Sequence, residues 1–260
     1  MPEISEDNPD NAPVTAAMVI IGNEILSGRT QDANLSYAAT RLNDFGIQMR
    51  EVRVIPDVED TIVETVNELR QKYHYVFTTG GIGPTHDDIT ADSIAKAFGV
   101  PLEINPMARA LLEEHYGAKD LTEARLRMAR VPKGGVLIDN PLSRAPGFQI
   151  ENVLVMAGVP VVMRSMIDSV APRLIGGKPV LSRSVMALVR ESDIADGLSA
   201  LQDKYSTVEI GSYPFFRKNK VGANLVMRGT DTDVLDQVVI DLKVLVRELG
   251  AEPVEDRPPE

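Results

Sequence analysis

The chain has 260 residues, 43% of them apolar, so it can bury one large core or a core with a smaller satellite domain. It has no cysteine, which excludes thiolate catalysis, disulfides and cysteine-ligated metal centres. Its net charge of −11 opposes broad attraction to nucleic acid or anionic lipid, and no apolar run approaches the roughly 20 residues that span a bilayer.

Residues 1–15 are acidic and contain proline, without the basic and apolar regions of a secretory signal. This composition predicts a disordered tail, and we expect a cytoplasmic protein.

Residues 16–99 then repeat a pattern of apolar strand and amphipathic helix. Strands are predicted at 16–21, 47–55 and 75–79, and helices at 31–45, 58–73 and 89–99. Parallel neighbouring strands need crossover helices of this length, and such crossovers are right-handed. The repeat therefore predicts an α/β fold: a doubly wound, mainly parallel sheet covered by helices on both faces in three layers.

The rest of the chain completes this domain and adds a second one. Two helices are predicted within 106–131, a hairpin about Glu151–Asn152, and a helix over 160–174. The Gly-Gly-Lys-Pro step at 176–179 indicates a boundary between an α/β domain, 16–176, and a small α+β unit, 179–250, with the order β-α-β-β-α. Residues 251–260 are predicted to be a loose tail.

The stretch "TTGGIGPTHDDIT", residues 78–90, follows the third predicted strand. Ligands of doubly wound sheets bind outside the carboxyl ends of strands, and glycines let backbone N–H groups approach a phosphate. The stretch lacks the lysine of a Walker loop and the glycine spacing of a dinucleotide fingerprint. Its acids have two interpretations: Thr85 and Asp88 form a capping box, or Asp87 and Asp88 hold a divalent cation shared with a ligand phosphate.

Two other loops follow predicted strands, "GNEILSG" at 22–28 and "AGVP" at 157–160. Glu24 is either a second metal ligand or general base, or a solvated loop acid. Asn34 either bonds a sugar or base edge or caps the first helix, and Asp32 is expected to cap. Of Arg125 and Arg127, one is expected to be solvated while the other reaches a phosphate.

In this order, "GNEILSG", "TTGGIGPTHDDIT", "RMARVP", "APGF" and "AGVP" resemble the molybdopterin-binding domain superfamily. The resemblance is greatest to the N-terminal domain of CinA proteins and the matching domain of FAD synthases, and "ESDIA" and "IGSYP" resemble the small KH-like unit that follows it. It implies a doubly wound fold, a homodimer or higher oligomer, and a metal-dependent pyrophosphatase that splits ADP-ribose or FAD into AMP and the partner phosphate.

The resemblance also implies the site. Mg²⁺, Mn²⁺ or Co²⁺ and the attacking water would be handled by Glu24, Asp87 and Asp88. The substrate-binding residues would be Gly22, Ser27, Asn34, Thr79, Gly80, Gly81, Gly83, Thr85, Arg127, Pro146 and Gly147. The chain departs from the CinA pattern at Asn23, at Ser143–Arg144 and in "AGVPVVM", which leaves the identity of the substrate open.

Two alternatives to a hydrolase use the same loops. One is a module that binds molybdopterin or its adenylate without hydrolysis, or that acts in assembling the molybdenum cofactor. The other is an inactive interaction protein, suggested by the altered loops. RNA is not an expected partner, because residues 180–250 contain no G-x-x-G and only one short basic patch, "FFRKNK".

Overall fold

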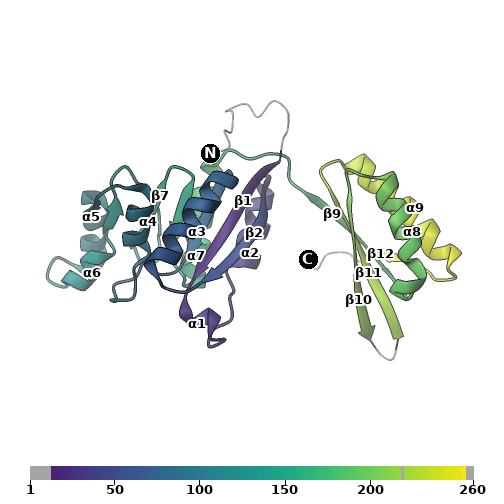
Figure 1. Cartoon of the computed structure of the whole chain (residues 1–260), viewed down its shortest axis with the longest axis horizontal. Helices are drawn as coiled ribbons and strands as arrows, with labels where there is room; N and C mark the ends of the chain where they lie inside the picture. Colours follow the sequence, from purple (N-terminus) through teal and green to yellow (C-terminus); the bar gives the residue numbers. More distant parts are fainter. Residues whose placement is uncertain (1–12, 218–219, 256–260) are drawn as a thin grey trace. The chain divides into compact units, whose positions relative to one another are not determined.

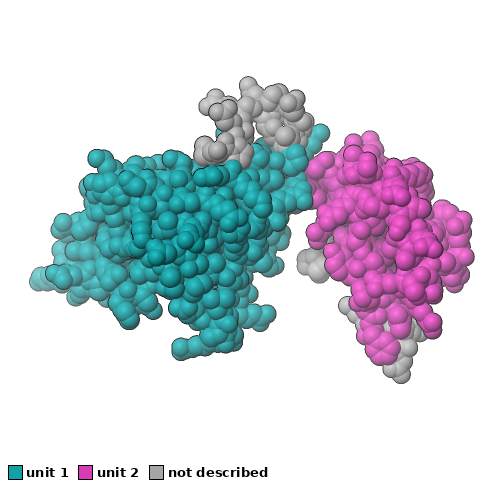
Figure 2. Space-filling view, in the orientation of Figure 1, with its two compact units in different colours: residues 1–178 teal, residues 179–260 magenta. Residues whose placement is uncertain are grey.

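The computed structural model describes residues 13–217 and 220–255. The chain divides after Lys178 into two compact units, unit 1 (Met1–Lys178) and unit 2 (Pro179–Glu260), shown in Figure 2. Residues 1–12 and 256–260 of the two predicted tails lie outside the described residues. Among the residues that the structure describes, no helix has both the length and the apolar character needed to cross a bilayer.

Unit 1 is built on a six-stranded sheet with the order β2-β1-β3-β8-β7-β6 (Figure 1). Strand β1 is parallel to β2 and β3, β3 is parallel to β8, and β7 is antiparallel to both β8 and β6. The doubly wound, mainly parallel sheet is confirmed, and the predicted hairpin forms its antiparallel part. The strands are β1 Val14–Ile21, β2 Ile47–Ile55, β3 Tyr75–Thr79, β6 Val136–Ile138, β7 Gly147–Ile150 and β8 Val153–Met156.

Both faces of this sheet are buried. Side chains alternate along a strand, so Met18 of β1 packs with helices α2 (Leu35–Asp44) and α7 (Pro160–Val170), whereas Val19 packs with α3 (Glu59–Lys72) and α4 (Thr90–Phe98). Two separate apolar clusters result, and the three layers follow from them. The smaller elements of unit 1 are α1 Asn23–Leu26, β4 Leu102–Ile104, α5 Pro106–Tyr116, α6 Glu123–Arg127, β5 Arg130–Pro132 and the 3-10 turn Ala171–Arg173.

Several boundaries differ from the prediction. Strand β1 begins at Val14, inside the expected tail. Helix α2 begins at Leu35, and the Asn34 side chain at its N-cap makes no capping hydrogen bond. The Asp32 carboxylate, two residues earlier, accepts the N–H groups of Asn34 (3.2 Å) and Leu35 (2.9 Å) and so pairs donors at the start of the helix. The helix predicted to reach residue 131 ends at Arg127, because Arg130–Pro132 pairs with β4 and buries Val131.

Unit 2 has the predicted order β-α-β-β-α. Its sheet has the order β10-β11-β9-β12, and α8 and α9 pack on one face around Leu225, Val238 and Leu242. The last strand corrects a prediction: Val254–Glu255, expected to be loose, pairs with β9. The elements are β9 Leu181–Ala187, α8 Glu191–Lys204, β10 Glu209–Arg217, β11 Lys220–Gly229, α9 Thr232–Glu248 and β12 Val254–Glu255.

Candidate functional site

The sheet of unit 1 has a switch point between β1 and β3. From β1 the chain crosses to β2 on one side, and from β3 it continues to elements on the other side. The loops after these two strands leave the same edge of the sheet, at the kind of switch point where open α/β sheets bind ligands. Both the "GNEILSG" loop and the glycine turn lie at this edge.

Gly80 is the point at which three loops meet. It adopts φ 103°, and a Cβ there would lie 2.1 Å from the carbonyl oxygen of Ile21, the last residue of β1. From the loop after β8, Gly158 also packs on it, since a Cβ on Gly158 would lie 3.2 Å from the Cα of Gly80. The N–H of Gly80 donates to the Met156 carbonyl at 3.2 Å. Glycine is therefore needed at position 80 because the neighbouring backbones pack closely on it. Its N–H group is already hydrogen-bonded to the Met156 carbonyl.

Thr90, the first residue of α4, holds the glycine turn in place. Its hydroxyl donates to the Gly80 carbonyl and its N–H donates to the Gly81 carbonyl, both at 2.9 Å. A Cβ on Gly81 would lie 2.2 Å from that hydroxyl, and Gly81 has φ 67°. The two glycines are thus required by close approach as well as by backbone conformation.

Asn34 joins the first loop to the last. Its side-chain Nδ2 donates to the Gly158 carbonyl at 2.8 Å, while its Oδ1 is buried without a hydrogen-bond partner among the described residues. The hydroxyl of Thr79, at the end of β3, is also buried and unpaired there. Buried polar atoms are rarely left unpaired, so these two oxygens have unused capacity to accept or donate hydrogen bonds.

Asp88 closes a turn ahead of helix α4. Its carboxylate accepts from the Thr85 N–H at 2.7 Å and from the Thr85 hydroxyl at 2.5 Å. The bond to the N–H is one half of the predicted capping box. The helix, however, begins at Thr90 with Ile89 as its N-cap, so the motif shapes the turn instead of capping the helix. Gly83 makes room for it, since a Cβ there would lie 2.6 Å from Asp88 Oδ2.

Asp87 faces solvent, with 68% of its side chain exposed, and the imidazole of His86 lies 4.0 Å from its carboxylate. The nearby Thr85 hydroxyl and the residue's own backbone N–H lower the pKa of Asp87, with smaller contributions from His86 and Arg127. Asp87 is therefore an accessible anion at neutral pH.

Glu24 lies on the short helix α1, and its carboxylate covers Gly22, where a Cβ would lie 2.4 Å from Glu24 Oε1. The Ser27 hydroxyl donates to the Glu24 carbonyl at 3.2 Å. Within the described ranges, no group of three or more histidine, aspartate or glutamate side chains is placed to hold a metal ion. Glu24 is thus not gathered with Asp87 and Asp88 into a ready-made cluster of three acids.

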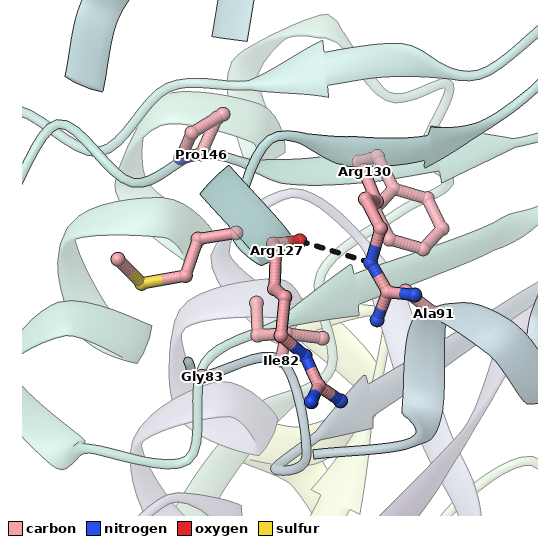
Figure 3. A pocket seen from close by; sticks show the side chains of 8 residues that line it. Ile82, Gly83, Ala91, Arg127, Arg130 and Pro146 are labelled. Carbon is pink, nitrogen blue, oxygen red and sulfur yellow. Dashed lines mark hydrogen bonds between the residues drawn. The ribbon is translucent and has the colours of Figure 1, made fainter. Parts of the chain in front are cut away.

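A small pocket lies at the far end of the glycine turn (Figure 3). Arg127 and Pro146 line it, whereas Gly147 is buried in β7, where a Cβ would lie 2.4 Å from the Val155 carbonyl oxygen. Arg125 turns elsewhere: its guanidinium lies 4.2 Å from the ring centre of Tyr116. The lining residues are Ile82, Gly83, Ala91, Arg127, Met128, Arg130, Pro146 and Phe148.

Sequence reasoning missed several residues of the site. Asp57 accepts the N–H of Asn23 at 2.9 Å, and its place directly after a strand was a usable signal. Arg130 and Asp92 form a two-pronged ion pair beside the pocket. Gly158 was expected only as part of a loop. Their roles depend on contacts between distant segments, which spacing along the chain does not show.

A doubly wound sheet whose switch point carries a glycine turn, two aspartates and an arginine-lined pocket defines a small-molecule-binding α/β domain. A family model described as "Probable molybdopterin binding domain" matches residues 17–176, and one described as "FAD synthase, middle domain" matches residues 179–254. The chain belongs to the molybdopterin-binding domain family, as its motifs predicted.

The chain is also similar to archaeal proteins and to a solved structure. A protein of Pyrobaculum calidifontis is 34% identical over 211 residues, covering 77% of this chain and 80% of the relative. One from Archaeoglobus fulgidus is 34% identical over 197 residues, covering 76% and 84%. A crystal structure described as the protein CinA, with unknown function, from Thermoplasma acidophilum superposes with a TM-score of 0.59 at 34% identity, covering 63% of this chain and 98% of that one.

Proposed function

We propose that the chain hydrolyses the diphosphate link of a nucleotide, FAD or ADP-ribose, with the help of a divalent cation, and releases AMP. The observation that carries the proposal is the position of Asp87 and Asp88 on the glycine turn at the switch point. The accessible carboxylate of Asp87 lies there, next to a glycine turn of the kind that can approach a phosphate.

The residues present fit a hard cation. Carboxylate oxygens are the ligands that Mg²⁺ and Mn²⁺ prefer, and Mg²⁺ is commonly held by one or two carboxylates together with substrate phosphates. Asp87 and Asp88 would hold it, together with the phosphate oxygens of the ligand. When bound, the cation would offset phosphate charge and favour departure of the leaving phosphate.

The chain's own residues supply the remaining parts of the proposed reaction. A water oxygen bonds to one phosphorus while the bond from that phosphorus to the bridging oxygen breaks, which gives AMP and the partner phosphate. Glu24 accepts the proton of the water. The Asn34 and Thr79 side chains, whose buried oxygens are unpaired, orient the nucleotide, and Arg127 balances phosphate charge.

The test is to incubate the purified full-length chain with FAD or ADP-ribose and Mg²⁺, Mn²⁺ or Co²⁺, and to measure AMP by chromatography. We expect AMP to form, and to stop forming when EDTA is added. The match of unit 2 to the FAD synthase middle domain makes FAD the first substrate to test. If no metal supports AMP release from either nucleotide, the hydrolase proposal fails.

A second candidate is binding of molybdopterin without hydrolysis, which the description of the family model for residues 17–176 favours. A pterin offers donors and acceptors to the unpaired oxygens of Asn34 and Thr79. Molybdopterin binding measured by calorimetry, together with no AMP release, would select this candidate.

We also propose a homo-oligomer, as the family resemblance implies. The edge strand β2 supports it, because Val52 and Val54 are 36% and 40% exposed there. Light scattering coupled to size-exclusion chromatography tests this, and a mass of one chain, 28.4 kDa, at micromolar concentration would contradict it.

A further inference from the structure

Arg130 connects two segments on opposite sides of the pocket. Its Nη1 and Nη2 donate to Asp92 Oδ1 and Oδ2 at 3.0 and 2.8 Å. Arg130 belongs to β5, and Asp92 to the first turn of α4, directly behind the glycine turn. Two-pronged arginine–carboxylate pairs fix orientation as well as distance. The pair therefore holds β5 against the helix on which the glycine turn ends.

A third nitrogen of the same guanidinium, Nε, contacts the last residue of α6. Arg130 Nε donates to the Arg127 carbonyl at 3.4 Å, the bond drawn as a dashed line in Figure 3. With Asp92 balancing its charge, Arg130 has little capacity left for an anion. Through its hydrogen bond to the Arg127 carbonyl, Arg130 instead holds the backbone of Arg127.

Arg127 is the cation that this arrangement leaves for a ligand. Its Nε is buried without a hydrogen-bond partner among the described residues. In Figure 3 its side chain extends past Ile82, away from Arg130. A buried donor without a partner is unfavourable, which suggests that a ligand oxygen completes it.

The pocket walls strengthen the interaction. Beside Arg127 and Arg130, the pocket is lined by residues with mostly apolar side chains: Ile82, Gly83, Ala91, Met128, Pro146 and Phe148. Hydrogen bonds to a charged group are stronger in such surroundings than in water, and the planar guanidinium matches the geometry of phosphate oxygens.

We propose that Arg130, held by Asp92, is a positioning residue that aims Arg127 at a phosphate group of the ligand. The inference rests on the proposed function for the identity of the ligand as a nucleotide diphosphate. The two neighbouring arginines have different roles: Arg127 contacts the phosphate, and Arg130 acts through Arg127. The interaction favours ligands with a phosphate at the far end of the glycine turn over neutral ligands of the same shape.

The experiment is a double-mutant cycle with inorganic pyrophosphate as the probe. Its Kd is measured by calorimetry on the full chain, with Mg²⁺ present, for Arg127→Met, Arg130→Met and the double variant. We expect Arg127→Met to raise Kd about tenfold or more and Arg130→Met to raise it about fivefold to tenfold. The double variant should bind no more weakly than Arg127→Met alone, because Arg130 acts only through Arg127.

Two further variants guard against unfolding and general charge effects. Arg130→Lys keeps the positive charge and a contact to Asp92 but loses the planar fork, so it should recover only part of the affinity. Arg125→Met removes a guanidinium that stacks on Tyr116 and should leave Kd within twofold. If Arg130→Met fails to fold, Arg130→Lys and Asp92→Asn take its place in the cycle.

The outcomes distinguish this inference from the proposed function. Additive effects in the cycle, or an unchanged Kd in a folded Arg130 variant, overturn the inference even if the wild-type chain hydrolyses FAD. A non-additive loss of pyrophosphate binding supports it even if no AMP forms. If the chain is active, KM should rise with the Arg130 variants while kcat changes less than twofold. A fall in kcat alone overturns the positioning role.

Discussion

Units 1 and 2 both pack helices on a sheet, yet the buried polar residues of the described chain all lie in unit 1. In unit 1 five polar side-chain atoms are buried without a partner in the described structure: Asn34 Oδ1, Thr78 Oγ1, Thr79 Oγ1, Arg127 Nε and Asn152 Oδ1. The described part of unit 2 contains none. There, both ends of the Gln202 amide are bonded, to Val208 at 2.7 Å and Ile210 at 2.9 Å.

The locations of the unpaired atoms explain the difference. Thr78 and Thr79 end β3, Asn34 bonds the loop after β8, and Arg127 lines the pocket, so four of the five lie around the glycine turn. Unpaired buried polar groups cost stability and are expected mainly where function requires them. By this criterion the unpaired atoms around the glycine turn of unit 1 belong to the candidate site.

The largest expected effect comes from a methyl group at the centre of the site. Gly80→Ala places a Cβ 2.1 Å from the Ile21 carbonyl at φ 103°, so the backbone must shift, at an expected cost of about 3 kcal/mol or more. In unit 2, Gly197→Ala meets only the flexible end of Leu245, at 2.5 Å, within a helix that favours alanine. Its free energy of unfolding should change by about 1 kcal/mol or less.

Urea unfolding followed by circular dichroism measures both substitutions. Gly158→Ala, whose Cβ would lie 3.2 Å from Gly80, should fall between them. Equal losses for Gly80→Ala and Gly197→Ala would remove the contrast between the units.

The next effect concerns activity more than stability. Asp88→Asn keeps an oxygen that can accept from the Thr85 N–H, so the turn should persist and the free energy of unfolding should change by about 1 kcal/mol or less. The loss of a metal-binding charge should lower kcat/KM for AMP release about 100-fold. Asp236→Asn in unit 2, which breaks an exposed ion pair with Arg183 at 3.1 Å, is the matched control and should retain full activity.

Thermal unfolding with and without Mn²⁺ supplies a readout that does not require turnover. We expect Mn²⁺ to raise the Tm of the wild-type chain and of Asp236→Asn, but not that of Asp88→Asn. A folded Asp88→Asn variant with normal activity and a normal Mn²⁺ shift would remove Asp88 from the cation site.

Away from the candidate site, both units contain a carboxylate that is bonded by the lysine and tyrosine at the end of a helix. Substitution of either carboxylate should change stability in the same direction. Lys72 and Tyr73 at the end of α3 donate to Glu51, each at 2.7 Å, and Lys204 and Tyr205 at the end of α8 donate to Asp241, again at 2.7 Å. These bonds, with Arg53 in unit 1, lower the pKa of Glu51 to about 2 and also lower the pKa of Asp241.

Because the folded-state pKa lies below the unfolded value, each carboxylate stabilises its unit above the unfolded pKa and stops doing so as pH falls through the folded pKa. Glu51 should therefore contribute fully above about pH 4.5 and lose its contribution towards pH 2. Since the carboxylate is partly exposed, we expect Glu51→Gln to cost about 1–2 kcal/mol at pH 7. Asp241→Asn should show the same sign, and urea unfolding at pH 7 and pH 3 measures both. A cost that grows on acidification would contradict the assignment.

The sequence predicts the scaffold well because its signals are local. Apolar runs and helical spacing located β1, α3 and α4, and glycines marked the turn at 80–83. It failed where a distant partner decides the outcome. Residues 128–131 continue a helical pattern, but residues 130–132 form a strand because they pair with β4. Residues 254–255 likewise form a strand because they pair with β9. The paired acids were recognised from their motif, whereas the contact between Arg130 and Asp92 spans 38 residues and leaves no local pattern.

The smallest expected effect has opposite signs in the two units. Thr79→Val replaces a buried, unpaired hydroxyl with a methyl group of similar size, so unit 1 should gain up to about 1 kcal/mol of stability. Ser184→Ala in unit 2 removes a hydroxyl that bonds Asn224 Oδ1 at 2.6 Å, and should cost about 1 kcal/mol.

Urea unfolding of both variants beside the wild type gives the two signs, and nucleotide binding by Thr79→Val gives the reason for the unpaired hydroxyl. If Thr79→Val is more stable and binds AMP or FAD more weakly, the unpaired group exists for the ligand. A loss of stability with unchanged binding would mean that the Thr79 hydroxyl belongs to the fold, and the contrast between the units would then rest on Asn34 and Arg127.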